Sequence, residues 1–309
     1  MTTSGIRFLK RSQINDAKWN NALEGSRNRN IYAYSWYLDA VSPDWCALVE
    51  GDYNAIMPLP IRRKYLVSYV FMPPYCQQLG VFSQKTIEAD TVSAFLNAIP
   101  SQVRYVDLNL NAQNLNTPAG LKARNMMNLV LHLNRGVDTV REQFSTNHKR
   151  NVRKFHDSGL VIERSGVPDE VIRLFEMGRG GQIGRYPDSD HKIFMSLFSA
   201  VQENARVVTL LARNANGLAV GGAVFFEALA GSYFIFSGVS KEGRDGSVMH
   251  GLVEYYLNEK STSISFLDFE GSNNPELARF YAGFGANESI YLHFVINRLP
   301  FPFSYLKPR

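Results

Sequence analysis

The sequence predicts an α/β (α+β) protein made of two tandem domains, each with a mixed, mostly antiparallel sheet flanked by helices. Its 309 residues exceed what one hydrophobic core usually serves, which favours two domains of ordinary size. Strand-type and helix-type segments alternate, and the second half repeats the order of the first. We therefore expect domains at residues 1–140 and 141–309, derived from a duplicated architecture.

The elements of the first half follow from local patterns. Apolar residues recur at near-helical spacing over 13–24, and a short helix follows at 35–41. Two apolar runs around the turn residues Gly51 and Asp52 predict a hairpin over 45–62, and 64–71 continues as a strand. The prolines of MPPYCQQLGVFS indicate a loop. A helix at 88–98 and strands at 103–109 and 127–133 complete this half.

The second half begins with a basic helix over 137–158 that ends at Gly159, a residue suited to positive φ. A strand at 160–164, helices at 168–177 and 189–203, a hairpin over 206–227 and a strand at 231–237 follow. A helix over 246–259, a strand at 264–269, a short helix at 275–282 and a closing strand at 288–296 extend it further.

Composition excludes several classes of protein. With 45% hydrophobic and 20% charged residues, the chain has the balance of a folded globular protein. It shows no signal-type segment and no apolar stretch of about eighteen residues, so we expect a cytoplasmic protein without a membrane span. Cys46 and Cys76 are the only cysteines, and neither they nor the scattered histidines have metal-ligand spacing, so no metal is expected.

A formal net charge of +5 indicates an anionic partner such as a nucleotide cofactor, RNA or acidic lipid. Many basic proteins of this size bind no polyanion, so both interpretations stand. Walker, GxSxG and HExxH motifs are absent from the sequence, which removes the common signatures of nucleotide hydrolysis, serine hydrolysis and zinc proteolysis.

The stretch SYFIFSGVSKEGRDGSVMHGLVEYYL is the most informative. A strand runs into a loop with Gly243, Arg244, Asp245, Gly246 and Ser247, which we expect to open directly into an amphipathic helix. The start of a helix presents unpaired N–H groups and the positive end of its dipole, where a phosphate is stabilised. The alternative is a plain turn with Asp245 or Ser247 as N-cap.

Downstream, FLDFEGSNNPELARFYAGFGA predicts a helix capped by Asn274 with Pro275 in its first turn. Tyr281 fits the buried face of this helix as well as a catalytic position. The spacing from Asn274 through Phe280, Tyr281 and Gly285 resembles the pattern that closes GNAT acetyltransferase domains. Together with NHKRNVRKFHDSGLVIE, GSYFIFSGVS and FLDFEG, it resembles the Fem-like (FemAB-type) branch of the GNAT superfamily.

That branch includes peptidyltransferases that move an amino acid from aminoacyl-tRNA onto a cell-wall precursor, and related acyltransferases. The resemblance covers about half of the chain in motif and most of it in architecture. It implies tandem GNAT-like domains, with a degenerate first copy on the acceptor side and a second copy that binds the donor. The stretch KEGRDGSVMHG lacks the spacing of the GNAT pyrophosphate loop, so acyl-CoA, including acetyl-CoA, and aminoacyl-tRNA both stand as donors.

The resemblance also implies roles for particular residues. The catalytic acid that protonates the leaving group corresponds to Tyr281, and a contact to the donor arm corresponds to Asn274. The remaining donor contacts correspond to Phe236, Ser237, Gly238, Arg244, Gly246 and Ser247. Asp268 matches the family's acidic position, as a catalytic or a structural residue.

Amine acylation needs a base to take a proton from the nucleophile. Asp268 and Glu270 are one residue apart after a strand, so in a regular strand they project to opposite faces. We favour Glu270 as the exposed one and hence as the base. An equally good interpretation is that Glu270 anchors the following loop.

Two basic features are candidates for phosphate or acceptor contact. The segment HKRNVRK gathers Lys149, Arg150, Arg153 and Lys154 on one helix, as a solvated face or as a contact for tRNA or lipid phosphate. The loop GRGGQIGRYPD carries Arg179 and Arg185 among four glycines, as a substrate-ordered loop or as a plain surface loop.

These observations predict an N-acyltransferase or aminoacyltransferase that works by direct transfer to an amine. The acceptor is a small molecule or a cell-wall precursor, tRNA is a possible partner, and the sequence does not indicate an oligomeric state. The alternative is a non-catalytic binding protein that retains the GNAT frame.

Overall fold

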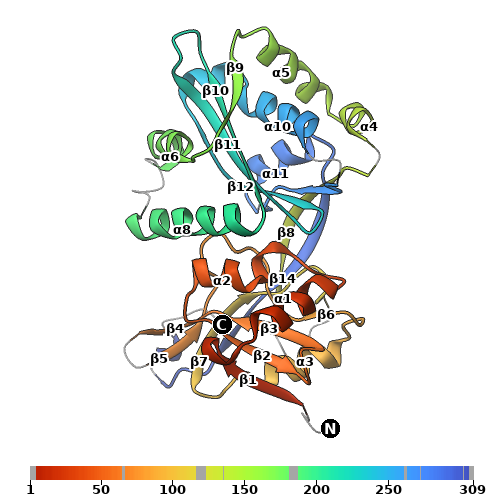
Figure 1. Cartoon of the computed structure of the whole chain (residues 1–309), viewed down its shortest axis with the longest axis vertical. Helices are drawn as coiled ribbons and strands as arrows, with labels where there is room; N and C mark the ends of the chain where they lie inside the picture. The colour runs from red at the N-terminus through yellow and green to blue at the C-terminus, as the bar shows by residue number, and fades with distance from the viewer. Residues whose placement is uncertain are drawn as a thin grey trace. The chain divides into compact units, whose positions relative to one another are not determined.

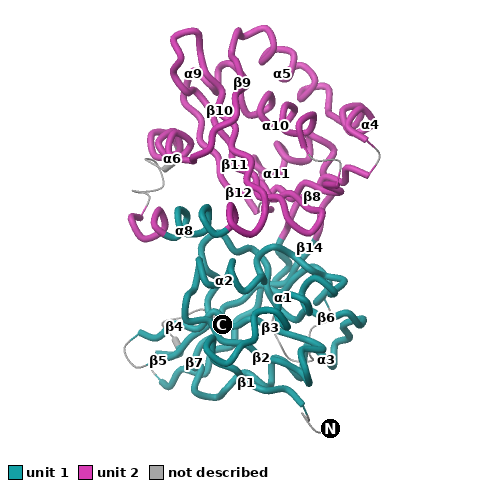
Figure 2. The backbone as a smooth tube through the Cα atoms, in the orientation of Figure 1, with its two compact units in different colours: residues 1–126, 193–200, 290–309 teal, residues 127–192, 201–289 magenta. Residues whose placement is uncertain are grey.

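A computed structural model of the chain describes residues 5–64, 67–115, 123–134, 136–180, 187–260, 263–271, 273–301 and 303–305. The chain forms two compact units (Figure 2). Unit 1 comprises residues 1–126, 193–200 and 290–309, and unit 2 comprises 127–192 and 201–289. Packing thus assigns residues 127–140 to unit 2, while the division of the sequence into a first and a second copy at 140/141 stays a prediction.

Unit 1 contains two groups of neighbouring strands and three short α-helices, among other segments (Figure 1). The first group has the order β1-β2-β3-β6, and the second has the order β4-β5-β7-β14. Its strands are β1 (Ile6–Lys10), β2 (Cys46–Glu50), β3 (Ala55–Leu59), β4 (Ile61–Lys64), β5 (Val67–Val70), β6 (Phe82–Ser83), β7 (Val103–Asn109) and β14 (Asn287–Asn297). Its helices are α1 (Asp16–Gly25), α2 (Ser35–Val41) and α3 (Ala89–Asn97).

Two tryptophans anchor the core of unit 1. Trp19 of α1 meets Trp45 edge to face, with ring centroids 4.7 Å apart, and both are fully buried. The indole N–H of Trp19 donates to the carbonyl of Ala33, so the polar atom of this buried ring is satisfied. The predicted helix at 35–41 and strand at 103–109 are confirmed with the expected bounds.

Unit 2 is built on a mixed sheet with the strand order β8-β13-β12-β11-β10-β9. Only β12 and β13 pair in parallel, and the other described pairs are antiparallel, so the predicted mixed, mostly antiparallel sheet is confirmed. The strands are β8 (Ala123–His132), β9 (Val161–Ser165), β10 (Arg206–Arg213), β11 (Ala219–Ala228), β12 (Gly231–Val239) and β13 (Phe266–Asp268).

The helices of this unit are α4 (Val137–Glu142), α5 (Thr146–His156), α6 (Asp169–Phe175), α9 (Lys241–Asp245), α10 (Val248–Glu259) and α11 (Pro275–Ala282). The helix α8 (Asp188–Asn204) is divided, because its residues 193–200 belong to unit 1 and its two ends to unit 2. The single helix expected over 137–158 is wrong, because it is two helices. Ser145 starts the second one, since its hydroxyl accepts from the backbone N–H of His148. Gly159 then has φ +72°, as expected of a residue that follows a helix.

Two adjacent glycines of β11 lie against the helices that cover the two faces of this sheet. A side chain at Gly221 would meet Val248 of α10, whereas one at Gly222 would meet Val171 of α6. Because successive residues of a strand point to opposite faces, α10 and α6 cover opposite sides. Among the described segments, no helix is long and apolar enough to cross a membrane.

Candidate active site

The strands β12 and β13 separate after three paired residues. Their parallel register joins Gly231 to Phe266 and ends with Tyr233 beside Asp268. Past that point β12 continues along β11 as far as Val239. The other branch stays with β8, because the N–H of Phe269 donates to the carbonyl of Leu129 over 3.0 Å. We call this divergence the fork. Of the expected strand 264–269, only Phe266–Asp268 is a strand, and these are the residues that pair with β12.

A β-bulge lies on β12 just above the fork. Phe234 stands opposite Phe225, but the next partner, Val224, stands opposite Phe236, so Ile235 is an extra residue on β12. A bulge redirects the backbone and often occurs next to functional sites. The sequence alone did not predict it, since IFSGV reads as an ordinary strand.

Three aromatic rings line the base of the fork. The ring of Tyr281 in α11 stacks on Phe269, with centroids 4.6 Å apart and planes 13° apart. Phe234 meets both rings edge-on, at 6.2 Å from Phe269 and 6.3 Å from Tyr281. Tyr281 is half-buried, so these contacts bring it to the point where the two strands part.

Asp268 ends the paired part of β13 as a buried carboxylate. Its two oxygens accept from the side-chain amide of Asn128 (2.9 Å) and from the backbone N–H of Glu270 (2.7 Å). Burial raises the pKa of Asp268 to about 6, against the opposing effect of these two hydrogen bonds. Asp268 therefore holds the turn that follows the strand, whatever further role it has.

Glu270 adopts φ +60° and Gly271 φ +68°, so the chain turns sharply there. A positive φ is uncommon outside glycine, and here the hydrogen bond to Asp268 holds it. The expectation that Asp268 and Glu270 project to opposite faces assumed a regular strand, which ends at Asp268. Glu270 is half-buried beside the fork, and Asn274 caps α11 by accepting from the N–H groups of Glu276 and Leu277.

The segment expected as a loop before the long helix is instead the short helix α9. The hydroxyl of Ser240 accepts from the N–H of Gly243 and starts it. Gly243 is needed for packing, because a Cβ there would lie 2.1 Å from the carbonyl oxygen of Val220. The guanidinium of Arg244 donates to the carbonyl of Val239 over 3.0 Å, which ties α9 to the end of β12.

Gly246 and Ser247 connect α9 to α10. Ser247 precedes α10 with φ +57°, and its hydroxyl donates to Asn151 of α5 instead of capping the helix. A side chain at Gly246 would come within 2.8 Å of Leu160. The predicted N-cap position of Ser247 is thus confirmed without the expected side-chain cap, since its hydroxyl is engaged elsewhere.

The three predicted donor residues of β12 differ in their surroundings. Phe236 is buried against Phe175 of α6, with ring centroids 4.9 Å apart. Gly238 lies under the backbone of α6, where a Cβ would be 2.4 Å from both the carbonyl oxygen of Val171 and the nitrogen of Phe175. Ser237, which lies between these two residues in the sequence, is half-buried. The structure therefore assigns Gly238 to helix packing.

A pair of histidines lies at the start of α10. The ring of His148 in α5 meets that of His250 edge to face, with centroids 4.6 Å apart. The Nε2–H of His148 donates to the carbonyl of Phe280 over 2.8 Å, and the amide of Asn151 donates to Nε2 of His250 over 3.4 Å. No sequence pattern predicts this pair, because the two residues are far apart in the chain and lack any motif spacing.

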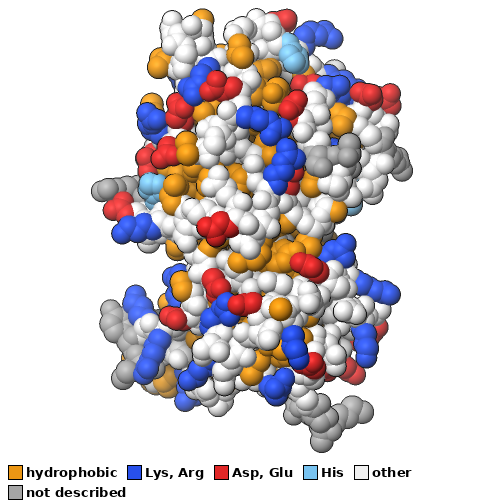
Figure 3. Space-filling view, in the orientation of Figure 1, with side chains coloured by type: hydrophobic (Ala, Val, Ile, Leu, Met, Phe, Trp, Pro, Cys, Tyr) orange, Lys and Arg blue, Asp and Glu red, His pale blue; other side chains and the backbone are white. Residues whose placement is uncertain are grey.

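The basic residues of α5 face solvent. Lys149, Arg150, Arg153 and Lys154 are all exposed, and within the described residues none of them forms an ion pair. Arg185 lies outside the described residues, and the side chain of Arg179 does as well. A Cβ at the adjacent Gly178 would be 3.2 Å from the carbonyl of Val239, so this segment runs beside the end of β12. In Figure 3, cations and anions are interspersed on the visible face of each unit.

The chain has the tandem GNAT-like fold of Fem-like proteins. FemX is similar to it with a TM-score of 0.69 at 13% identity, covering 97% of this chain and 99% of FemX. L-PGS from Bacillus licheniformis has a TM-score of 0.57 at 12% identity, covering 94% and 95%. A tandem GNAT protein from the clavulanic acid biosynthesis pathway has a TM-score of 0.54 at 12% identity, covering 96% and 99%. No protein-family model and no curated relative matches the amino-acid sequence.

Proposed function

We propose that this chain is an N-acyltransferase or aminoacyltransferase that moves an acyl group from an activated donor to an amine. The observation that carries the proposal is the fork: β12 and β13 part at Tyr233 and Asp268, directly below a bulge and beside Tyr281. A fork of this kind leaves a stretch of β12 without a strand on one side, where an acyl carbonyl can be held by backbone N–H groups.

The proposed reaction is direct transfer. The amine nitrogen attacks the donor carbonyl, the carbon–sulfur or carbon–oxygen bond to the donor breaks, and the amine loses one proton. Glu270 is the proposed base for that proton, and the hydroxyl of Tyr281 is the proposed acid that protonates the leaving sulfur or oxygen. Asp268 acts as a positioning residue, because it fixes the backbone of Glu270.

The donor is proposed to be an acyl-CoA or an aminoacyl-tRNA. It would run from the fork along Phe236, Ser237 and Gly238 toward the junction of α9 and α10. Arg244, Gly246, Ser247 and Asn274 are the further contacts that we propose. Lys149, Arg153, Arg179 and Arg185 would contact phosphate groups of the donor or of a cell-wall-precursor acceptor. Small-molecule amines are the other acceptor class.

The test is isothermal titration with acetyl-CoA, longer acyl-CoAs and aminoacyl-tRNA, followed by turnover measurements with any donor that binds. Tyr281→Phe keeps the ring that stacks on Phe269 but removes the proton, so we expect kcat to fall by about 10²-fold or more. Tyr255→Phe is the matched control, a half-buried tyrosine of α10. Unchanged turnover in Tyr281→Phe would remove Tyr281 from the acid role.

A non-catalytic binding protein is the second candidate function. This candidate is favoured because two side chains of the proposed donor segment already form hydrogen bonds within the chain. Arg244 donates to Val239, and Ser247 donates to Asn151. This alternative predicts that none of the three donor classes binds, whereas the transferase predicts that at least one does.

A further inference from the structure

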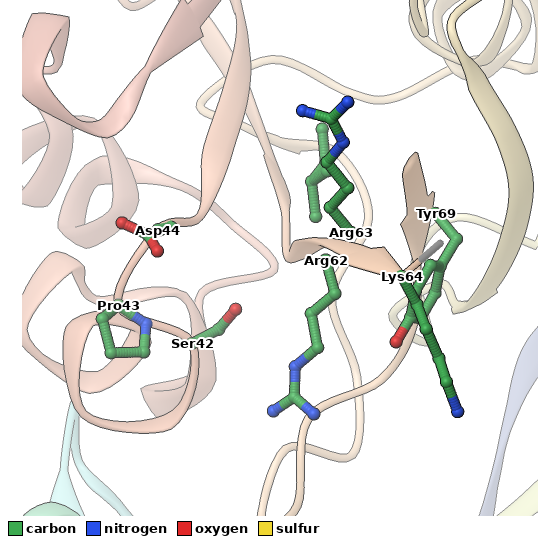
Figure 4. Close-up of a pocket in the computed structure, with 8 residues that line it drawn as sticks. Ser42, Pro43, Asp44, Arg62, Arg63, Lys64 and Tyr69 are labelled. Atoms are coloured by element: carbon green, nitrogen blue, oxygen red, sulfur yellow. The ribbon is translucent and has the colours of Figure 1, made fainter. Parts of the chain in front are cut away.

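A hollow of about 570 Å³ in unit 1 lies between the loop after α2 and the β4–β5 hairpin (Figure 4). We call it the charged pocket. It is distinct from the fork, which belongs to unit 2. Its lining consists of Ser42, Pro43, Asp44, Ile61, Arg62, Arg63, Lys64 and Tyr69.

One wall of the charged pocket is cationic. The antiparallel register pairs Arg62 with Tyr69 and Lys64 with Val67, so Arg62, Lys64 and Tyr69 share one face of the hairpin. Arg63 leaves β4 in the opposite direction (Figure 4). The guanidinium of Arg62 lies 4.0 Å from the centre of the Phe71 ring, a cation–π contact that orients it.

The other wall carries negative charge. Asp44 is exposed and lies two residues after Ser42, the C-cap residue of α2. The last carbonyls of a helix carry partial negative charge, which adds to that of the Asp44 carboxylate. Within the described residues no ion pair of 4.0 Å or less joins Asp44 to Arg62 or Arg63, so opposite charges line the same hollow without neutralising each other.

We propose that the charged pocket binds an aminoalkyl phosphate, a ligand with a phosphate and a primary ammonium group on a short linker. The phosphate contacts Arg62 and the face of the hairpin that also carries Lys64, and the ammonium contacts Asp44. A phosphate is the anion that the planar guanidinium of arginine fits with paired hydrogen bonds. The ammonium group offers up to three donors to a carboxylate and to helix-end carbonyls.

The cations of β4 have a second explanation: charged residues on an edge strand prevent that strand from pairing with other chains. β4 is at the end of its group of strands. That reason does not involve Asp44, which lies on a separate loop across the hollow (Figure 4). The two explanations therefore differ in what they predict for Asp44.

The test is calorimetric titration of the full chain with O-phosphoethanolamine, inorganic phosphate and ethylamine. We expect O-phosphoethanolamine to bind more tightly than either fragment. Arg62→Gln should weaken it by about tenfold, the effect of losing one charge-assisted hydrogen bond. Asp44→Asn should weaken O-phosphoethanolamine similarly, while leaving inorganic phosphate unchanged or binding it more tightly. Arg27→Gln, an exposed cation elsewhere in unit 1, should change nothing.

The proposal is overturned if O-phosphoethanolamine binds no better than inorganic phosphate, or if Asp44→Asn binds it as wild type does. Lys64→Gln is a second variant of the cationic wall. A thermal melt of each variant confirms that it is folded. A second arm uses phosphatidylcholine vesicles with and without phosphatidylethanolamine. Binding only to the vesicles that contain phosphatidylethanolamine, with competition by O-phosphoethanolamine, assigns a lipid headgroup; binding of the soluble compound alone assigns a free phosphate ester.

Discussion

The imidazole of His148 stands edge-on to that of His250; His148 donates to the carbonyl of Phe280, and His250 accepts from the amide of Asn151. Burial, with a smaller contribution from the neighbouring His148, lowers the pKa of His250 to about 4. The pKa of His148 is lowered by burial, against a hydrogen bond to Phe280 that raises it. Nε2 of His250 can accept from Asn151 only while its ring is neutral, so protonation of His250 removes this contact between α5 and α10.

The first prediction is that this pair makes unit 2 less stable in acid. An unfolded histidine has a pKa of about 6.5, so between about pH 6.5 and 4 the unfolded chain binds protons that the folded chain does not. The stabilisation is present above pH 6.5 and is lost as the pH falls. We expect His250 to account for about 2 kcal/mol between pH 7 and 4.5, measured by urea unfolding.

His250→Asn is the comparison for this prediction. The raised pKa of Asp268 acts in the opposite direction, favouring the folded state as the pH falls, but it is common to both proteins. The difference between wild type and variant therefore isolates His250. Equal pH slopes in the two proteins would contradict the assignment.

The second prediction concerns the turn after β13. Asp268→Ala removes the acceptor for the amide of Asn128, which is buried, and for the N–H of Glu270, which is partly buried. Leaving these donors unpaired should cost about 2–4 kcal/mol of unfolding free energy. Asp138→Ala removes a carboxylate whose side chain is 97% exposed and should cost less than about 0.5 kcal/mol. Comparable losses in both variants would show that Asp268 does not hold the turn.

The third prediction is that Gly238 is required for packing. In Gly238→Ala the new methyl group would meet the backbone of α6, which cannot move aside as a flexible side chain would. We expect a loss of about 1–3 kcal/mol in unfolding free energy. Gly166→Ala is the matched control, since a Cβ there has no heavy atom within 4 Å. If Gly238→Ala and Gly166→Ala have the same unfolding free energy, the close approach of α6 does not require glycine at position 238.

The fourth prediction tests the exposed cations of α5. If the donor is aminoacyl-tRNA, replacing Lys149 and Arg153 by glutamine should weaken tRNA binding measured by fluorescence anisotropy. The slope of log K against log salt should fall by about 1.4–1.8, the value for two lost phosphate contacts. The double variant Lys85→Gln/Arg104→Gln removes two exposed cations of unit 1 and should leave the slope unchanged. An unchanged slope in the α5 variant would exclude this helix from tRNA contact.

Local signals predicted α2, β7 and α11 with their observed bounds, because a run of alternating residues lies within its element and a cap such as Asn274 lies directly beside it. The helix α9 was missed, since Gly243 made KEGRD look like a loop, and only the Ser240 cap and the packing against Val220 make it helical. The bulge at Ile235 and the histidine pair arise from residues that meet in space, so no local pattern contains them.

The separation of β12 from β13 determines which kind of molecule can bind along β12. On the side that β13 leaves, the part of β12 from Phe234 to Val239 has no neighbouring strand among the described residues. It is a short sheet edge inside a folded unit, and an edge is completed by any extended chain with amide groups at matching intervals. A pantetheine-like or peptidyl arm could extend the ladder there, whereas a plain hydrocarbon of equal length would leave those amides unsatisfied.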